Sequence, residues 1–399
     1  MPLLTSMLIL IVLARLLGKI FERYNQPAIV GEMLAGVLLG PSVLNLIQPN
    51  AALSGIAEFA VFLVVLSAGL EMNLKDILFT LRGRGIVIAL LGFLLPFAGG
   101  VSLAILFEMD VMRTVFLGLC VSITALPVAV RILQNFNLLN TDIARHAVAT
   151  AIFNDVVALL VLGIVLNLPE QPSFQAVAVS IARTSWKLLL LGAFILSFNW
   201  FLQKMIRRGI RLERFSEKIV DFLGTEAMFG ILVLFVLVFG SVSEALGFHF
   251  VIGAFFGALL IERNFFLAAR YDELNHTLSS ITGGFLAPVF FAYLGLEFNI
   301  AVLKSTTFIT LLLAISVGSK IVAGWLGGWL IRLPTVHSLG IGIILNGRGV
   351  MELVIASIAY ERGFIGQGLF STLVFMGVVT TMITPLMFRK WVIPRLHAS

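Results

Sequence analysis

Charged residues and cysteine are scarce in this sequence of 399 residues, and their scarcity decides the class of protein. Only 12% of the residues are Asp, Glu, Lys or Arg, against about 25% in ordinary globular domains. The single cysteine, Cys120, excludes a disulfide-built scaffold. Hydrophobic residues make up 59% and include 34 Phe, which excludes a disordered chain. A water-exposed surface cannot be built from this composition, so we predict an all-α integral membrane protein.

The motifs of common enzymes and pumps are missing too. The sequence has no P-loop lysine motif, no G-x-S-x-G and no H-E-x-x-H. We therefore expect no enzyme activity and no cofactor, and we exclude ATP-driven transport by this chain alone. The net charge of +6 does not indicate a nucleic-acid partner. The basic residues lie in short runs between apolar stretches, where membrane topology explains them.

Thirteen stretches are apolar and long enough for membrane helices, each of which needs about 20 residues. The predicted spans are 2–21, 27–47, 51–70, 86–107, 113–133, 143–168, 183–206, 219–242, 248–262, 278–296, 306–330, 336–359 and 368–388. The longest polar connection is about residues 204–218. We therefore expect one transmembrane domain over residues 1–399 and no soluble regulatory domain.

The distribution of Lys and Arg predicts the orientation. Most of these 27 residues fall in loops on one predicted face, together with the C-terminus. Because cytoplasmic loops carry an excess of Lys and Arg, we predict a multi-pass protein of the cell's inner (plasma) membrane, embedded in lipid. The N-terminus lies outside and the C-terminus lies in the cytoplasm in this prediction.

A weak internal duplication runs through the chain. Residues 69–74 (GLEMNL) resemble residues 295–300 (GLEFNI), and residues 35–40 resemble residues 253–257. Both matches pair a span with the seventh span after it, so the second copy points the other way through the membrane. This predicts two inverted six-helix repeats, at about 2–168 and 219–388, joined by a connector helix at 183–206. Inverted repeats are typical of secondary transporters, whose site lies at the midplane where broken helices meet.

Asp155 is the clearest candidate site residue. It lies near the middle of the sixth span, with Asn154 before it and apolar sequence on both sides. A carboxylate at that depth is costly unless it is protonated, paired or bound to a cation. We favour a functional role over a structural ion pair, because a structural role would not explain Asn154.

Three further charges lie in or near the middle of spans. Lys320 has two interpretations. It is a functional group, either a buried partner of Asp155 or a group that titrates itself, or it is a fixed countercharge that holds helices together. The sequence leaves both interpretations open. Arg348 and Glu352 are four residues apart, so an intrahelical ion pair is expected. We favour a structural role for this second pair.

Two spans carry helix-breaking residues at the same depth. Pro127 follows Thr124 in the fifth span, and Gly347 and Gly349 interrupt the twelfth. The two spans correspond in the repeat, and paired interruptions of this kind indicate a binding site. Freed carbonyls, the Thr124 hydroxyl and the Asp155 carboxylate are hard oxygen ligands, so we predict a Na⁺ or K⁺ site there.

Four segments together resemble one family. They are residues 31–42 (GEMLAGVLLGPS), 68–74 (AGLEMNL), 153–156 (FNDV) and 346–353 (NGRGVMEL). In this combination the chain resembles the monovalent cation:proton antiporter-2 family, which includes bacterial sodium/proton antiporters, Kef-type potassium efflux systems and plant cation/proton exchangers. The resemblance implies a sodium/proton antiporter-like fold with crossing broken helices, a separate dimerisation domain, a homodimer and a role in pH homeostasis. By position it implies that Asp155 binds cation and proton, that Thr124 is the polar residue of the first broken helix, and that Lys320 pairs with the aspartate.

The resulting hypothesis is exchange of a monovalent alkali cation, with Na⁺ favoured, for H⁺ by alternating access. Many electrogenic members have two acidic residues where this chain has Asn154 and Asp155, so we predict electroneutral exchange. One net charge would cross if Lys320 also released a proton. The alternatives are a Kef-like K⁺/H⁺ efflux antiporter, a cation channel, a membrane sensor domain, or an intramembrane enzyme with Asp155 as base.

Overall fold

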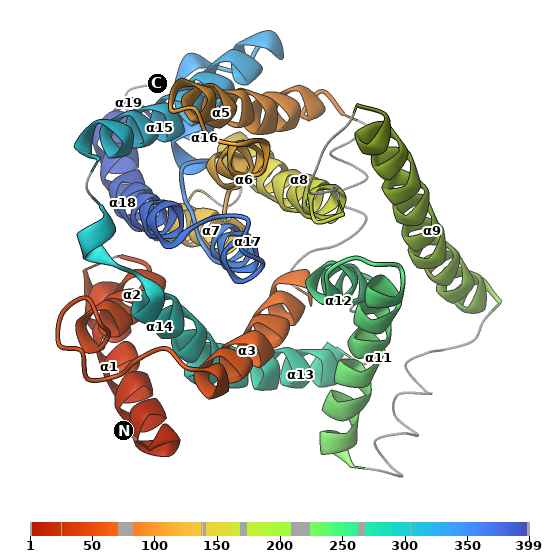
Figure 1. Cartoon of the computed structure of the whole chain (residues 1–399). Coiled ribbons are helices and arrows are strands. Elements are labelled where there is room, and N and C mark those ends of the chain that lie inside the picture. The colour runs from red at the N-terminus through yellow and green to blue at the C-terminus, as the bar shows by residue number, and fades with distance from the viewer. Residues whose placement is uncertain are drawn as a thin grey trace. The chain divides into compact units, whose positions relative to one another are not determined.

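The computed structural model describes residues 2–24, 26–70, 83–136, 138, 141–167, 174–208, 224–261, 268–303 and 305–396. Within these ranges every regular element is a helix (Figure 1), so the all-helical class is confirmed. Nine of the described helices are long and apolar enough to cross a membrane. Shorter apolar helices lie at Ala28–Leu39, Val111–Ser122, Phe250–Leu259 and Thr335–Ile344.

The helix bounds follow the hydropathy of the sequence, with interruptions at Pro and Gly. In chain order they are α1 (Leu3–Arg23), α2 (Ala28–Leu39), α3 (Ala51–Leu70), α5 (Ile86–Leu106), α6 (Val111–Ser122), α7 (Leu126–Asn135), α8 (Asp142–Val165), α9 (Phe174–Arg207), α11 (Thr225–Ala245), α12 (Phe250–Leu259), α13 (Ala268–Ile281), η2 (Thr282–Leu286), α14 (Ala287–Glu297), η3 (Ile300–Val302), α15 (Thr306–Leu330), α16 (Thr335–Ile344), α17 (Val350–Glu361), α18 (Gln367–Trp391) and α19 (Ile393–Leu396).

Several predicted spans differ from these helices. The predicted span 27–47 is too long, because α2 ends at Leu39 and a turn follows at Gly40 and Pro41, where proline cannot continue a helix. The predicted spans 113–133 and 336–359 each divide into two helices. The predicted connector, 183–206, lies inside the longer helix α9.

The chain divides into two compact units. Unit 1 consists of Met1–Ala57, Asp76–Ala158 and Pro288–Ser399, and unit 2 consists of Glu58–Lys75 and Leu159–Ala287. In unit 1, α15 packs against α5, α16 and α18, and α6 packs against α5 and α17 (Figure 1). One buried apolar cluster joins helices α5, α7, α8, α16 and α18 through Ile88, Ala129, Ala147, Ile344 and Phe388. This cluster holds α7 and α16, one half of each broken helix, within one body.

Two helix crossings depend on the absence of a side chain at glycine. In unit 1, a Cβ on Gly36 of α2 would overlap the backbone of Ala292 and Gly295 in α14. In unit 2, a Cβ on Gly69 of α3 would contact Ala258 of α12 at 2.6 Å. Small residues let backbones approach closely in membrane proteins, where packing replaces the hydrophobic drive between helices.

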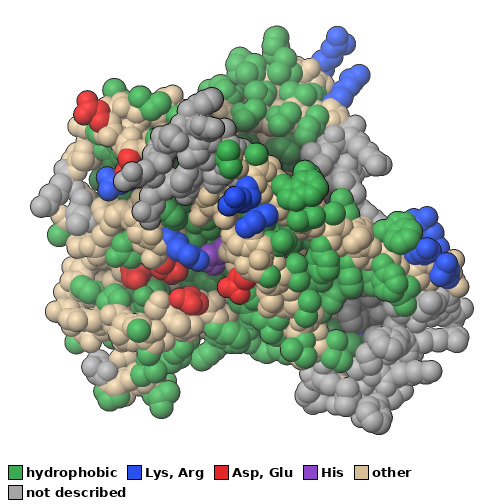
Figure 2. All heavy atoms as spheres, turned by 45° about the vertical axis from the view of Figure 1, so that its right-hand side comes forward, with side chains coloured by type: hydrophobic (Ala, Val, Ile, Leu, Met, Phe, Trp, Pro, Cys, Tyr) green, Lys and Arg blue, Asp and Glu red, His purple; other side chains and the backbone are tan. Residues whose placement is uncertain are grey.

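Unit 2 is built on aromatic packing between α9 and α11. The ring of Phe239 lies 5.1 Å from that of Phe194 and 5.5 Å from that of Phe198. The side of α9 away from these contacts is apolar and exposed, with Trp186 at 62% and Leu189 at 65%. Figure 2 likewise shows hydrophobic side chains over much of the visible face, with charged side chains in small groups. A surface of this kind is suited to lipid rather than to water.

Candidate functional site

The candidate site in unit 1 is built around two interrupted helices. The first is broken at residues 123–125, between α6 and α7, and the second at residues 345–349, between α16 and α17. Pro127 lies in the first turn of α7, where its missing N–H has no helical partner to lose. The two breaks are bonded to each other, because the backbone N–H of Ala125 donates to the carbonyl of Gly347 at 2.8 Å.

Each break exposes backbone groups that a continuous helix would pair. The last carbonyls of α6 and α16 and the first N–H groups of α7 and α17 have no intrahelical partner. Helix C-termini carry partial negative charge and attract cations, and N-termini attract anions. The breaks therefore provide fixed partial charges in the interior of a membrane protein.

Arg348 caps the end of α6. Its side chain is 1% exposed, and its Nη2 donates to the carbonyl of Val121 at 2.8 Å. Its Nη1 donates to the carbonyl of Cys120 and, at 3.4 Å, to that of Ile123. The guanidinium of the second broken helix thus satisfies the free carbonyls of the first.

Lys320, on α15, is fully buried and directs its ammonium to the same break. Its Nζ donates to Thr124 Oγ1 at 2.8 Å, to the carbonyl of Gly92 at 3.1 Å and to the carbonyl of Ser122. These three bonds use the three donors of an ammonium group. The lysine therefore holds α5, α15 and the first break together.

The Thr124 hydroxyl is the point where these elements meet. It accepts from Lys320 and, at 3.3 Å, from Asn154 Nδ2. It donates to the carbonyl of Leu345 in the second break at 2.9 Å. Asn154 Nδ2 also donates to the Ser122 carbonyl at 3.2 Å. One hydroxyl thus connects α8 and α15 to both broken helices.

Asp155, on α8, is 2% exposed. Its Oδ1 and the Oδ1 of Asn154 are buried, and neither accepts a hydrogen bond within the part of the chain that the structure describes. Unsatisfied buried oxygens are costly, and Asn154, the residue before Asp155 on α8, is bonded to Thr124 through its amide nitrogen. This arrangement is suited to a ligand that supplies positive charge.

The family resemblance implies that Lys320 pairs with Asp155. The two side chains interact electrostatically, but among the described ion pairs none joins their charged atoms within 4.0 Å. The reason is that the three lysine donors are directed to Gly92, Ser122 and Thr124. Lys320 is a neighbouring charge for Asp155 rather than a hydrogen-bonded partner.

The expected pair of Arg348 and Glu352 is present, with Nη1 and Oε2 3.7 Å apart and both side chains buried. The Glu352 oxygens accept no hydrogen bond from the described residues, because the guanidinium donates to α6 instead. Gly347 and Gly349 lie in the second break as predicted. The side chain of Pro127 lies outside the described part of the structure.

Thr381, on α18, was missed by the sequence analysis. Its Oγ1 accepts from the backbone N–H of Arg348 and donates to the carbonyl of Arg348, both at 3.0 Å. These bonds pair the backbone N–H and carbonyl of Arg348 within the second break. The side chain of the same residue caps the end of α6 at the first break. The only sequence signal for Thr381 was a polar residue within the last long apolar span. The carbonyls of Gly92, Ser122 and Leu345 had no sequence signal, because every residue has a carbonyl.

Comparison with known proteins assigns this chain to a family. The family model described as "Sodium/hydrogen exchanger, transmembrane" matches residues 8–393. The chain belongs to this family of monovalent cation:proton antiporters. It is therefore a multi-pass membrane protein of a transporter family.

Similar members come from plants and bacteria. Cation/H(+) antiporter 20 of Arabidopsis thaliana is 28% identical over 94% of this chain and 47% of its own length, so the chain spans about half the length of such plant relatives. The probable Na(+)/H(+) antiporter GerT of Bacillus cereus is 25% identical over 97% of this chain and 98% of its own. The Na(+)/H(+)-K(+) antiporter GerN of Bacillus cereus is 26% identical over 94% and 92%.

A solved structure supports the fold. The sodium proton antiporter MjNhaP1 from Methanocaldococcus jannaschii superposes with a TM-score of 0.70 at 15% identity, covering 97% of this chain and 96% of that one. At this identity the comparison shows the fold alone.

Proposed function

We propose that this chain is a secondary antiporter that exchanges a monovalent alkali cation for H⁺ by alternating access, with cation and proton competing for Asp155. The observation that carries the proposal is the buried Oδ1 of Asp155, which has no hydrogen-bond donor among the described residues; the Oδ1 of Asn154, the residue before it, has none either. A buried carboxylate in that state needs a positive charge before it can cross a membrane interior. A proton and a bare cation both supply one.

The ligand chemistry supports an alkali cation. The oxygens of Asp155 and Asn154 are hard, and group 1 ions are bound by oxygen. Thr124 Oγ1 already accepts two hydrogen bonds and donates one, which fills the capacity of a hydroxyl, so its role is to position Asn154. We favour Na⁺, and K⁺ is the second candidate because the relative GerN carries both ions in its name. Lys320 and Arg348 are fixed cations that hold the breaks, and the chain acts in transport rather than as an enzyme.

The architecture in this proposal has thirteen spans in two inverted six-helix repeats. The two glycine crossings support it. Gly295, in the GLE segment of α14, packs on α2. Gly69, in the GLE segment of α3, packs on α12. Under a shift of seven spans α2 corresponds to α12 and α3 to α14, so the two crossings are equivalent. We further propose a homodimer in the plasma membrane with the N-terminus outside.

Vesicle transport tests the function. Purified protein in proteoliposomes with an internal pH dye should move protons when Na⁺, K⁺ or Li⁺ is added outside, and Asp155→Asn should abolish this. Asp142→Asn is the matched control, because Asp142 lies on the same helix but is exposed at its first turn. Cation-driven proton flux that persists in Asp155→Asn would refute the assignment of the site.

The same vesicles test the stoichiometry. With one carboxylate per cycle the exchange is electroneutral, so its rate should not change when the membrane potential is clamped at different values. Transfer of one net charge would be driven by about 2.3 kcal/mol per 100 mV, which would make the rate follow voltage and contradict electroneutral exchange.

A further inference from the structure

One pocket of unit 1 lies apart from the buried charges. It has a volume of about 440 Å³ and is lined from three segments, by residues 107–109 and 113, by residues 303, 305 and 308–309, and by residues 366, 368–369 and 372. We call it the end pocket, because these segments lie where α5 ends and where α6, α15 and α18 begin. Ligand sites in proteins range over about 300–1,000 Å³, so the end pocket has room for part of a lipid-sized molecule.

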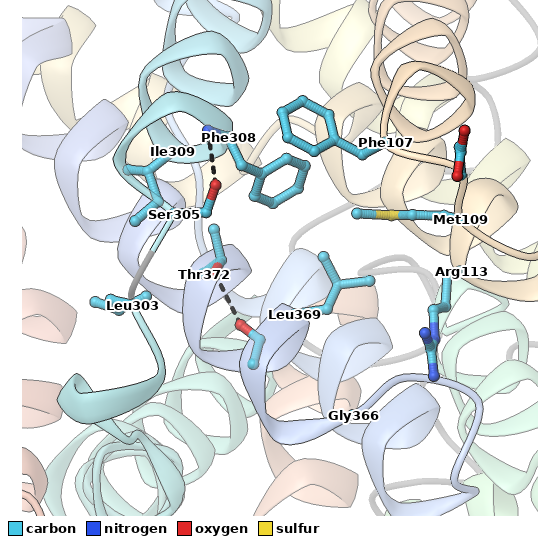
Figure 3. Close-up of a pocket in the computed structure, with 12 residues that line it drawn as sticks. Phe107, Met109, Arg113, Leu303, Ser305, Phe308, Ile309, Gly366, Leu369 and Thr372 are labelled. Atoms are coloured by element: carbon cyan, nitrogen blue, oxygen red, sulfur yellow. Dashed lines mark hydrogen bonds between the residues drawn. The ribbon is translucent and has the colours of Figure 1, made fainter.

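The wall of the end pocket is apolar. Phe107 and Phe308 pack edge to face with ring centres 4.9 Å apart. Figure 3 shows these two rings with Leu369 and Met109 converging on the space from different segments. The hydroxyls of Ser305 and Thr372 are bonded to nearby backbone groups, so they do not make this wall polar. An aliphatic chain would match this lining.

The surroundings of the pocket are apolar and exposed, which suits contact with lipid. Ile105 and Leu106, at the end of α5, are 65% and 68% exposed, and Val111, at the start of α6, is 65% exposed. Ile105 and Leu106 directly precede Phe107, and Val111 lies between Met109 and Arg113 of the pocket lining. Because the pocket lies at the ends of spanning helices, it has the depth at which a phospholipid headgroup meets its acyl chains.

The rim carries both signs of charge. Arg113 and Glu108 line the pocket, and Figure 3 shows Arg113 at its edge. The Nε of Arg113 pairs with Asp110 Oδ2 at 3.0 Å, which leaves its terminal nitrogens without an acceptor among the described residues. A guanidinium binds phosphate oxygens through two parallel bonds. Glu108 and Asp110 would repel a purely anionic headgroup.

Glu108 also has an unusual backbone. Its φ is 52°, in the left-handed region that non-glycine residues other than Asn, Asp and His seldom adopt. The N–H of Glu108 donates to the Ile105 carbonyl, and that of Met109 to the Ala104 carbonyl, both at 3.0 Å. The turn thus holds a carboxylate at the rim where a glycine would fit with less strain.

We propose that the end pocket binds a zwitterionic phospholipid whose headgroup carries a phosphate and a primary ammonium. The phosphate pairs with Arg113, the ammonium pairs with Glu108, and the start of one acyl chain lies between Phe107, Phe308 and Leu369. A quaternary ammonium cannot donate hydrogen bonds to the carboxylate, and an anionic headgroup has no charge to offer it. The pocket therefore selects a primary-amine headgroup. This inference does not depend on the proposed transport activity.

The bound lipid would contact the start of the first broken helix. Arg113 lies in the first turn of α6, and Leu369 and Thr372 lie in the first turns of α18, the helix that follows the second broken helix. A ligand that bridges these residues restrains the starts of α6 and α18 without entering the site at Asp155.

Lipid retention tests the proposal. The full chain is reconstituted with equal amounts of phosphatidylethanolamine, phosphatidylcholine and phosphatidylglycerol, extracted in mild detergent and analysed by native mass spectrometry. We expect one phosphatidylethanolamine per chain above background. Arg113→Gln and Leu369→Trp should each reduce its retention at least tenfold, the first by removing the phosphate partner and the second by filling the cavity.

Matched controls use the same chemistry elsewhere. Arg145→Gln removes an exposed arginine that is also paired with an aspartate three residues before it, and Leu386→Trp changes an exposed leucine of α18. Both should retain the lipid as the parent does. The proposal is overturned if the parent retains no lipid, if it retains phosphatidylglycerol or phosphatidylcholine equally well, or if Arg113→Gln in properly folded protein retains the lipid fully.

Discussion

Replacement of Thr124 by valine removes one hydroxyl from the centre of the buried site and keeps nearly the same shape. Thr124 Oγ1 accepts from Lys320 at 2.8 Å and donates to the Leu345 carbonyl at 2.9 Å. The bond from Asn154 is longer, at 3.3 Å, and that amide keeps its second acceptor, the Ser122 carbonyl. The substitution therefore leaves one ammonium donor and one carbonyl unpaired in a fully buried place.

The size of the effect follows from those two bonds. A hydrogen bond to a charged group contributes about 1.5–3 kcal/mol and a neutral one about 0.5–1.5 kcal/mol. Thr124→Val should thus lower the free energy of unfolding by roughly 2–4 kcal/mol. It should also raise the cation concentration for half-maximal exchange by about tenfold, because the Asn154 amide loses one of the two acceptors that position it and a cost of only about 1.4 kcal/mol gives that factor.

Thermal unfolding in detergent and cation titration in proteoliposomes measure the two effects. Thr124→Ser is the control, since it keeps the hydroxyl and loses a single methyl group, worth about 0.8 kcal/mol. It should stay close to the parent in exchange. A valine variant with parental stability and parental cation dependence would show that the hydroxyl does not connect the two breaks, and the reasoning would be wrong.

Two further substitutions test how the breaks are held. Arg348→Lys keeps the charge but cannot bond the carbonyls of Cys120, Val121 and Ile123 with one planar group. We therefore expect a loss of about 2–4 kcal/mol in unfolding free energy, and an unchanged midpoint in thermal unfolding would contradict this role. Thr381→Val removes both bonds to the Arg348 backbone and should slow exchange, whereas Thr381→Ser should restore it; equal rates for the two variants would exclude positioning by the hydroxyl.

Much of the fold could be predicted from hydropathy, because a helix that faces lipid must be apolar over its length. The breaks were predicted as well, since Pro127 and the glycines at 347 and 349 disfavour continuous helix. Helix limits were less accurate. The end of α2 at Leu39 depends on a turn inside an apolar stretch, and the start of α9 at Phe174 lies beyond the predicted limit, because apolar composition alone does not mark where a helix ends.

The sequence predicted which residues form the candidate site but not which hydrogen bonds they make. Depth along each span identified Asp155, Lys320 and Thr124, and the structure brings Thr124 and Lys320 into contact. Sequence could not show that Lys320 donates to backbone carbonyls rather than to Asp155, because any residue can supply a carbonyl. The contact of Thr381 with Arg348 depends on how α18 packs, which no local pattern encodes.

The most direct test of competition at Asp155 is proton release on cation binding. Purified protein is kept in weakly buffered detergent solution at a pH low enough for Asp155 to carry a proton before the cation is added. Na⁺ or K⁺ is then added while a pH indicator measures released protons and calorimetry measures the heat of binding. We expect about one proton to be released for each cation bound, and neither proton release nor binding heat in Asp155→Asn. Saturable cation binding without proton release in the parent protein would contradict it.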